Sequence, residues 1–136
     1  MIQLLKKHGL IYDQLPAILW ATLIFVASSI PGITLPDLKF VPTDKVVHLL
    51  VYLVLCALIY RAFTYQKKFT KLTSWSLAFA VLLTILFGLT DEFHQSFVPN
   101  RVSDVLDLTA DSAGAFLFWG YKLLRRRLSN SSTRIV

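Results

Sequence analysis

Nineteen consecutive uncharged residues, Leu72–Thr90 (LTSWSLAFAVLLTILFGLT), are the clearest structural signal in this chain. The segment is rich in Leu, Ala and Phe, and Trp75 near one end suits a membrane interface. Each helical residue rises about 1.5 Å, so about 20 of them cross the apolar core of a bilayer. The segment is therefore predicted to be a membrane-spanning helix.

Three further segments extend this prediction to a four-helix membrane protein. The chain is 55% hydrophobic and 16% charged, whereas soluble domains carry roughly a quarter charged residues. The apolar runs do not alternate in polarity as barrel strands do. The expected fold class is all-α, an integral membrane bundle of four transmembrane helices. Spans are expected at about 15–30, 46–63, 72–90 and 105–124, forming one domain over residues 1–128, with a short disordered tail at 129–136.

The charges are distributed unevenly between the ends of these spans. Eleven of the 14 Lys and Arg residues fall in segments 1–14, 61–74 and 122–136, and such residues are enriched in cytoplasmic loops. Both termini are therefore expected in the cytoplasm. Seven of the eight acids fall at the opposite, outer ends. A net charge of +6 could favour nucleic acid, but this distribution favours anionic membrane lipids instead, and no nucleic-acid partner is expected.

The first polar cluster opens the predicted second span. Asp44, His48 and Tyr52 are spaced at i, i+4 and i+8, so they form one stripe on a helix. Asp44 could then orient His48 for proton transfer. The alternative is structural: Asp44 and Lys45 begin a helix, where an acid is favoured by the helix dipole, and His48 only satisfies a neighbour.

The second cluster is DEFHQSFVPNR at residues 91–101. Two carboxylates and an imidazole follow the apolar segment within four residues. On a continuing helix Asp91, His94 and Gln95 lie on one face, and a Pro–Asn pair then turns the chain. Arg101 follows with a guanidinium suited to a phosphate or carboxylate. The alternative is a solvated acidic helix end that Arg101 neutralises.

The third cluster opens the fourth span. Asp104, Asp107 and Asp111 are spaced at i, i+3 and i+7, which places them on one helical stripe. Asp111 falls inside the span, where a charge is tolerated only against a partner or a wet cavity. It is therefore expected to face inward. These acids could instead be buried hydrogen-bonding partners for the basic residues of the other two clusters.

Together the clusters contain the groups used in general acid–base catalysis. In this interpretation His94 shuttles protons with a neighbouring acid, and His48 is a second acid or base. The candidate catalytic residues are His94, Asp91, Glu92, His48 and Asp44, and the candidate substrate-binding residues are Arg101, Gln95, Asp107, Lys45 and Asp111. Because the acids outnumber the bases at this end, a divalent cation such as Mg²⁺, Mn²⁺ or Zn²⁺ is also considered. No metal signature assigns its ligands.

The combined motifs resemble the VanZ-like family. The matching residues are Asp44-Lys45, His48, Tyr52, the run from Asp91 to Arg101, Asp104, Asp107 and Gly114. The resemblance implies a small multi-pass protein of the bacterial cytoplasmic membrane. It also implies a link to glycopeptide resistance, because the founding member is associated with resistance to teicoplanin. That antibiotic acts on lipid-linked cell-wall precursors outside the membrane.

Two functions are expected from these observations. The first is a membrane-embedded hydrolase or transferase that acts on an outer-leaflet lipid or a lipid-linked envelope precursor through an outward-facing polar site. The second is a non-catalytic accessory protein that modulates antibiotic access to the membrane. A proton-coupled transporter is disfavoured, because the inner halves of the spans offer no polar path to match the outer acids.

Overall fold

The computed structural model describes residues 10–31, 43–66 and 69–132, and this part of the chain is helical, without strands. Its all-α class is therefore confirmed. The helices are α1 (Leu10–Ser28), α2 (Thr43–Tyr65), α3 (Thr70–Ser74), α4 (Ser76–Gln95) and α5 (Val105–Ser132).

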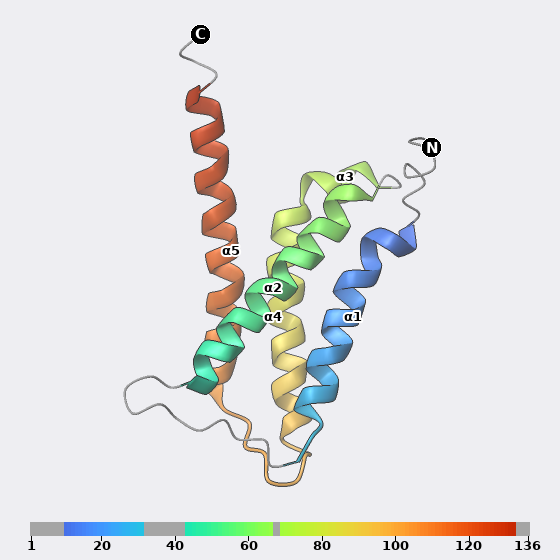
Figure 1. Cartoon of the computed structure of the whole chain (residues 1–136), viewed down its shortest axis with the longest axis vertical. Helices are drawn as coiled ribbons and strands as arrows, with labels where there is room; N and C mark the ends of the chain where they lie inside the picture. The colour runs from blue at the N-terminus through green and yellow to red at the C-terminus, as the bar shows by residue number, and fades with distance from the viewer. Residues whose placement is uncertain (1–9, 32–42, 67–68, 133–136) are drawn as a thin grey trace.

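The four long helices alternate in direction (Figure 1). The first turn of α1 and the last turn of α5 consequently lie at the same end of the molecule. Helix α2 occupies the centre, because it packs against α1, α3, α4 and α5. The described parts of α1 and α5 do not contact each other. Every set of three helices that all contact one another therefore includes α2.

Two of the helices, α2 and α4, are long and apolar enough to cross a membrane. The apolar part of α1, Tyr12–Ser28, is shorter, and α5 does not meet the same criterion. Many large apolar side chains on the four long helices are nevertheless exposed, among them Leu19, Leu50, Leu82 and Phe116. A surface of this kind suits lipid better than water. These features support a membrane protein, while the four-span topology and the side on which each terminus lies remain predictions.

Several boundaries differ from those predicted. The span expected at 72–90 is divided at Trp75 between α3 and α4, and α4 continues to Gln95. Helix α5 continues to Ser132, so the disordered tail expected at 129–136 was wrong for residues 129–132. That stretch contains no Gly or Pro to stop the helix. The remaining tail, 133–136, and the N-terminal residues 1–9 lie outside the described part.

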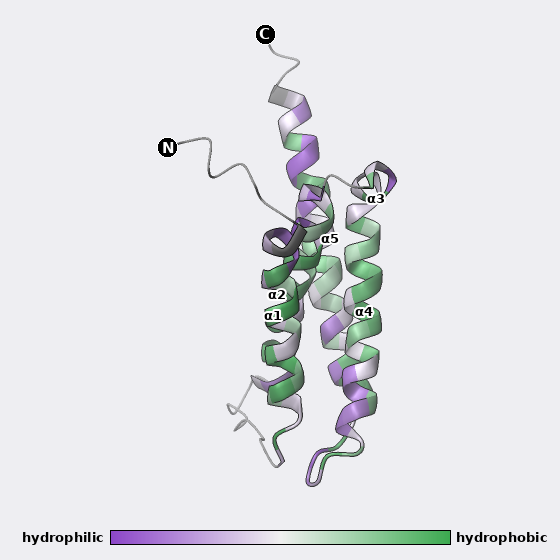
Figure 2. Cartoon of the chain, turned by 90° about the vertical axis from the view of Figure 1, so that its right-hand side faces the viewer, coloured by the Kyte–Doolittle hydropathy of each residue, from purple (hydrophilic) through white to green (hydrophobic). Residues whose placement is uncertain are grey.

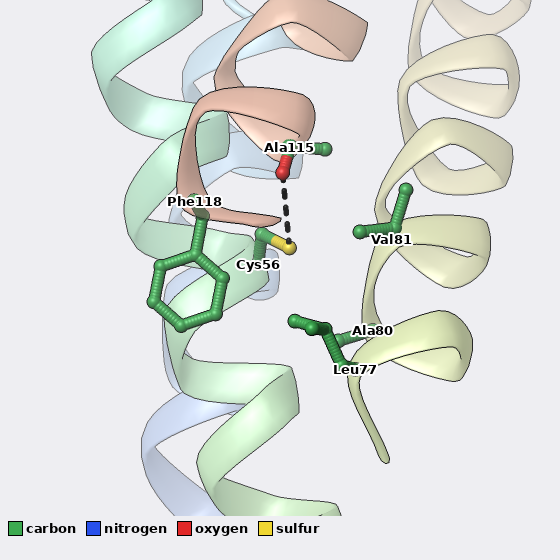
Figure 3. Packing of buried hydrophobic residues seen from close by; sticks show 6 residues of the cluster. All are labelled: Cys56, Leu77, Ala80, Val81, Ala115 and Phe118. Atoms are coloured by element: carbon green, nitrogen blue, oxygen red, sulfur yellow. Dashed lines mark hydrogen bonds between the residues drawn. The ribbon is translucent and has the colours of Figure 1, made fainter. Parts of the chain in front are cut away.

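A small apolar core joins α2, α4 and α5 (Figure 3). Its centre is Cys56, which is fully buried, with its Sγ 3.9 Å from the backbone oxygen of Ala115. Ala80 and Ala115 are also fully buried, and such small side chains let helix backbones approach closely. A second contact joins α1 to α2, because the indole nitrogen of Trp20 donates to the Val51 carbonyl at 3.0 Å.

Gly114 lies where α5 approaches the backbone of α2 closely. A Cβ atom at this position would lie 2.3 Å from the Leu49 carbonyl oxygen and 2.9 Å from the Leu53 nitrogen. Only glycine fits there without moving a backbone. Because Asp111 lies one turn earlier on α5, the same close approach brings its carboxylate against α2.

Polar residues gather at one end of this bundle. Figure 2 shows the lower end of α4 in hydrophilic colours beneath a hydrophobic middle part. The start of α2, the end of α4 and the start of α5 all lie at this end (Figure 1). The three sequence clusters therefore come from segments that the fold places together.

Candidate functional site

The connection from α4 to α5 is shaped by a turn at residues 98–101. The amide of Arg101 donates to the Val98 carbonyl at 3.1 Å, and Asn100 has a positive φ of 59°. Asn tolerates this conformation, and Pro is favoured just before it, which explains the turn expected at Pro99–Asn100. Asp104 then caps α5, since its side chain accepts a hydrogen bond from the Leu106 amide at 2.8 Å.

His48 and Asp111 form a pair between α2 and α5. The Nδ1 atom of His48 lies 2.9 Å from Oδ1 of Asp111. Asp111 is fully buried, so its predicted inward orientation is correct. The sequence predicted that Asp44 orients His48, but the hydrogen bond observed for the His48 ring is to Asp111. The contact across the helix interface replaces it, because Gly114 lets α5 approach so closely.

Lys45 is the centre of an ionic group beside that pair. Its ammonium bonds to Asp104 at 2.7 Å and to Asp107, and it lies 3.7 Å from Asp44. Asp104 precedes α5, and the ammonium of Lys45 lowers the pKa of its carboxyl below the ordinary range. Three carboxylates therefore share one cation. This agrees with the alternative in which Asp107 is a buried hydrogen-bonding partner for a basic residue.

Asp91 and Glu92 face two different groups of partners. Oδ2 of Asp91 accepts hydrogen bonds from the Tyr52 hydroxyl at 3.2 Å and from the Gln95 amide at 3.1 Å. Oε2 of Glu92 accepts from the backbone nitrogen of Asp104 at 2.8 Å and from the Ser103 hydroxyl at 3.2 Å. Glu92 thus holds the α4–α5 connection, whereas Asp91 belongs to the α2 side.

His94 is directed toward the end of α1. Its Nε2 lies 2.9 Å from the Ser29 hydroxyl, and its ring is 4.6 Å from that of Phe25. It does not hydrogen-bond either neighbouring carboxylate, so the proton-shuttling arrangement predicted for it is not the one observed. The Ser29 hydroxyl donates to the Phe25 carbonyl at 2.6 Å. Ser29 therefore accepts from His94 and is not activated as a nucleophile in this arrangement.

Arg101 also contacts the end of α1. One terminal nitrogen donates to the Ala27 carbonyl at 3.0 Å, and Nε donates to the Ile30 carbonyl at 3.3 Å. A cation is favourable at this end of a helix, where backbone oxygens lack partners. Two of the five N–H donors of the guanidinium are used in this way. Within the described residues, no carboxylate neutralises Arg101.

A cavity of about 200 Å³ lies among α1, α2, α4 and Arg101. Five of the ten predicted site residues line it, namely Asp44, His48, Asp91, Gln95 and Arg101. Ser28 and Tyr52 add two hydroxyls. The remaining wall is aliphatic and is formed by Leu23, Ile24, Ala27, Val47 and Val51. The cavity therefore combines an acidic and basic wall with an apolar one.

The other five predicted residues do not line this cavity. Asp111 contacts His48. Lys45, Asp107 and Glu92 belong to the polar network that joins α2, α4 and α5. His94 lies beside Ser29. Asp91 and Gln95 form a separate hydrogen-bonded group with Tyr52. Arg101 and His94 both contact the end of α1.

Sequence reasoning missed some of the participants. Tyr52 was placed on the correct stripe but was not chosen as a site residue. The cap formed by Asp104 could have been found, because Ser-Asp before an apolar helical run is a helix-start signal. The role of Ser103 had no comparable signal.

The fold and the site together define a small all-helical protein with candidate membrane spans and an acid-rich polar site at one end. The VanZ/LLP1 family model matches residues 14–125, so the chain belongs to this family. The resemblance seen in its motifs is thereby confirmed. No curated protein and no solved structure matches the chain.

Proposed function

We propose that this protein binds an outer-leaflet lipid or a lipid-linked envelope precursor in the cavity described above. The cavity carries this proposal, because it joins Arg101 and His48 to an aliphatic wall. An amphiphile presents the same combination of a charged headgroup and an apolar chain. The family membership supports a membrane location, which we take to be the bacterial cytoplasmic membrane, crossed several times.

We further propose that the bound headgroup is modified by hydrolysis or group transfer. Arg101 can bind a phosphate, because its guanidinium has donors left beyond its two carbonyl bonds. Asp91 faces the cavity and is held by Tyr52 and Gln95, so it is the carboxylate best positioned to transfer a proton. Asp44 is a second acid on the same wall.

A non-catalytic role is the second candidate. The aliphatic wall formed by residues such as Leu23 and Val51 could hold an acyl chain without any chemistry. A protein of this type would change how a lipid-tailed glycopeptide such as teicoplanin reaches its target. Either candidate could contribute to glycopeptide resistance.

Mass spectrometry of envelope lipids tests the proposal and separates the two candidates. The strains to compare are wild type, a deletion, Asp91→Asn, Arg101→Ala and Asp13→Asn. Asp13 is a buried acid of α1 outside the cavity, so its variant is the matched control. A catalytic protein predicts a lipid change shared by the deletion, Asp91→Asn and Arg101→Ala but absent from the control. Unchanged lipids in the deletion would refute catalysis.

A further inference from the structure

Three buried carboxylate oxygens at the polar end have no hydrogen-bond donor among the described residues: Oδ1 of Asp91, Oε1 of Glu92 and Oδ2 of Asp111. Asp91, Glu92 and Asp111 are each no more than 4% exposed. Leaving a buried acceptor without a partner is unfavourable, and more so when it is charged. These oxygens would therefore be stabilised by cations or protons that the hydrogen bonds among the described residues do not supply.

Two of these acids lie around one imidazole. His48, Glu92 and Asp111 each offer a ligand atom, and the three atoms all lie within 4.8 Å of one another. We propose that His48, Glu92 and Asp111 bind a divalent transition-metal cation at the junction of α2, α4 and α5. This inference goes beyond the proposed function, because it stands on the arrangement of these side chains and not on any lipid.

The spacing suits a bound ion. Metal–ligand bonds to His nitrogen and carboxylate oxygen are about 2.0–2.2 Å long, so two ligands of one ion lie up to about 4 Å apart. Small side-chain rotations would bring the trio within that range. Glu92 also keeps its second oxygen in a hydrogen bond from the backbone nitrogen of Asp104. Such bonds orient carboxylate ligands in known metal sites.

A neighbouring trio is a weaker candidate. Asp44, His48 and Asp107 also bring three ligand atoms within 4.8 Å. Lys45, however, is bonded to Asp107 and lies 3.7 Å from Asp44, so an ammonium already neutralises these acids. No Lys or Arg in the described part of the chain forms an ion pair with Glu92 or Asp111. The unneutralised trio is therefore the one that we assign to the metal.

The donor set indicates the class of cation. One imidazole and two carboxylates suit zinc or manganese, which accept both nitrogen and oxygen. Mg²⁺ prefers oxygen donors and retains water, so it fits the imidazole poorly. An ion here would lie beside the cavity wall that contains His48, where it could attract an anionic group. Asp91 would remain the acid or base on that wall.

Zinc binding to the purified full-length protein in detergent tests this site. The protein is stripped with a chelator, titrated with ZnSO₄ by calorimetry, washed and analysed for bound metal by mass spectrometry. We expect about one zinc per chain, retained in excess Mg²⁺, and a rise in the thermal unfolding temperature with zinc. Absence of zinc binding by folded wild type, or displacement by Mg²⁺, would overturn the proposal.

Variants locate the site. Glu92→Gln and Asp111→Asn keep the shape of each side chain, and each is expected to weaken zinc binding by at least about tenfold. Asp13→Asn, a buried acid of α1, is the control and should bind zinc as wild type does. Binding by both site variants at wild-type affinity would overturn the assignment. Because this readout is metal content and not lipid chemistry, its failure is distinguishable from failure of the proposed function.

Discussion

Nδ1 of His48 lies 2.9 Å from Oδ1 of Asp111, although the two residues are 63 positions apart in the chain. Asp111 is fully buried, and 14% of the His48 side chain is exposed. This pair joins α2 to α5 at the polar end of the bundle, where His48 lines the cavity and Asp111 does not. The energetic coupling of the two side chains is therefore measurable.

Replacing His48 and Asp111 singly and together is expected to give non-additive losses of stability. Each single alanine variant removes one partner and leaves the other polar group buried without its hydrogen bond, which costs about 1–3 kcal/mol and more when the remaining group is charged. The double variant should lose about 1–3 kcal/mol less than the sum. Thermal unfolding of metal-free protein in detergent measures the coupling. Strict additivity would show that the two side chains do not interact.

Gly114→Ala should destabilise the protein strongly. The added methyl group would meet the Leu49 carbonyl oxygen at 2.3 Å, so α5 must move away from α2. Overpacking typically costs about 1–3 kcal/mol, and backbone contact makes the upper value the expectation. Gly120→Ala on the same helix meets nothing within 4 Å and should be neutral or slightly stabilising. Equal unfolding temperatures for the two variants would contradict this helix packing.

Lys45→Met should destabilise the start of α5. Its ammonium holds Asp104 and Asp107, and removal leaves the buried Asp107 without its cation. Lys71→Met replaces an exposed lysine of α3 and is the control. We expect the unfolding temperature to fall clearly for the first variant and by little for the second. If adding Asp107→Asn restores the stability, the unpaired Asp107 carboxylate is the cause of the loss. A Lys45 variant as stable as wild type would argue against the ionic group.

Arg101→Lys should release the α4–α5 connection from the end of α1. A lysine ammonium cannot reproduce the planar fork that bonds the Ala27 and Ile30 carbonyls. Hydrogen exchange of the amides at residues 96–104 should therefore speed up by several-fold, as expected when local opening becomes easier. Arg125→Lys, at an exposed position of α5, should leave that exchange unchanged. Identical protection in both variants would mean that Arg101 does not hold this connection.

The sequence predicted the helical class and the gathering of three polar clusters at one end. Apolar runs such as Leu72–Thr90 establish the helices, and alternating helix directions then place residues 44–52, 91–101 and 104–111 together. The spacing of Asp91 and Gln95 placed both on one face of a continuing helix, although the predicted span ended at residue 90. These inferences depend on local pattern and on helix direction, both of which can be derived from one chain.

The pairing of individual side chains could not be predicted in the same way. His48 bonds to Asp111 and not to Asp44 because Gly114 fixes the distance between α2 and α5. His94 turns to Ser29 because the end of α1 lies beside α4. Both outcomes depend on the rotation of neighbouring helices about their axes. Spacing along one helix carries no information about that rotation.

Cysteine labelling in intact cells most directly tests whether the polar site opens outside the cytoplasm. In a Cys56→Ala background, Val102→Cys places a thiol at a position that is 82% exposed in the α4–α5 connection. Ser131→Cys places one on the exposed last turn of α5. We predict that a membrane-impermeant maleimide labels the first variant in intact cells and the second only after permeabilisation. The reverse pattern would place the site in the cytoplasm and contradict an action on outer-leaflet lipid.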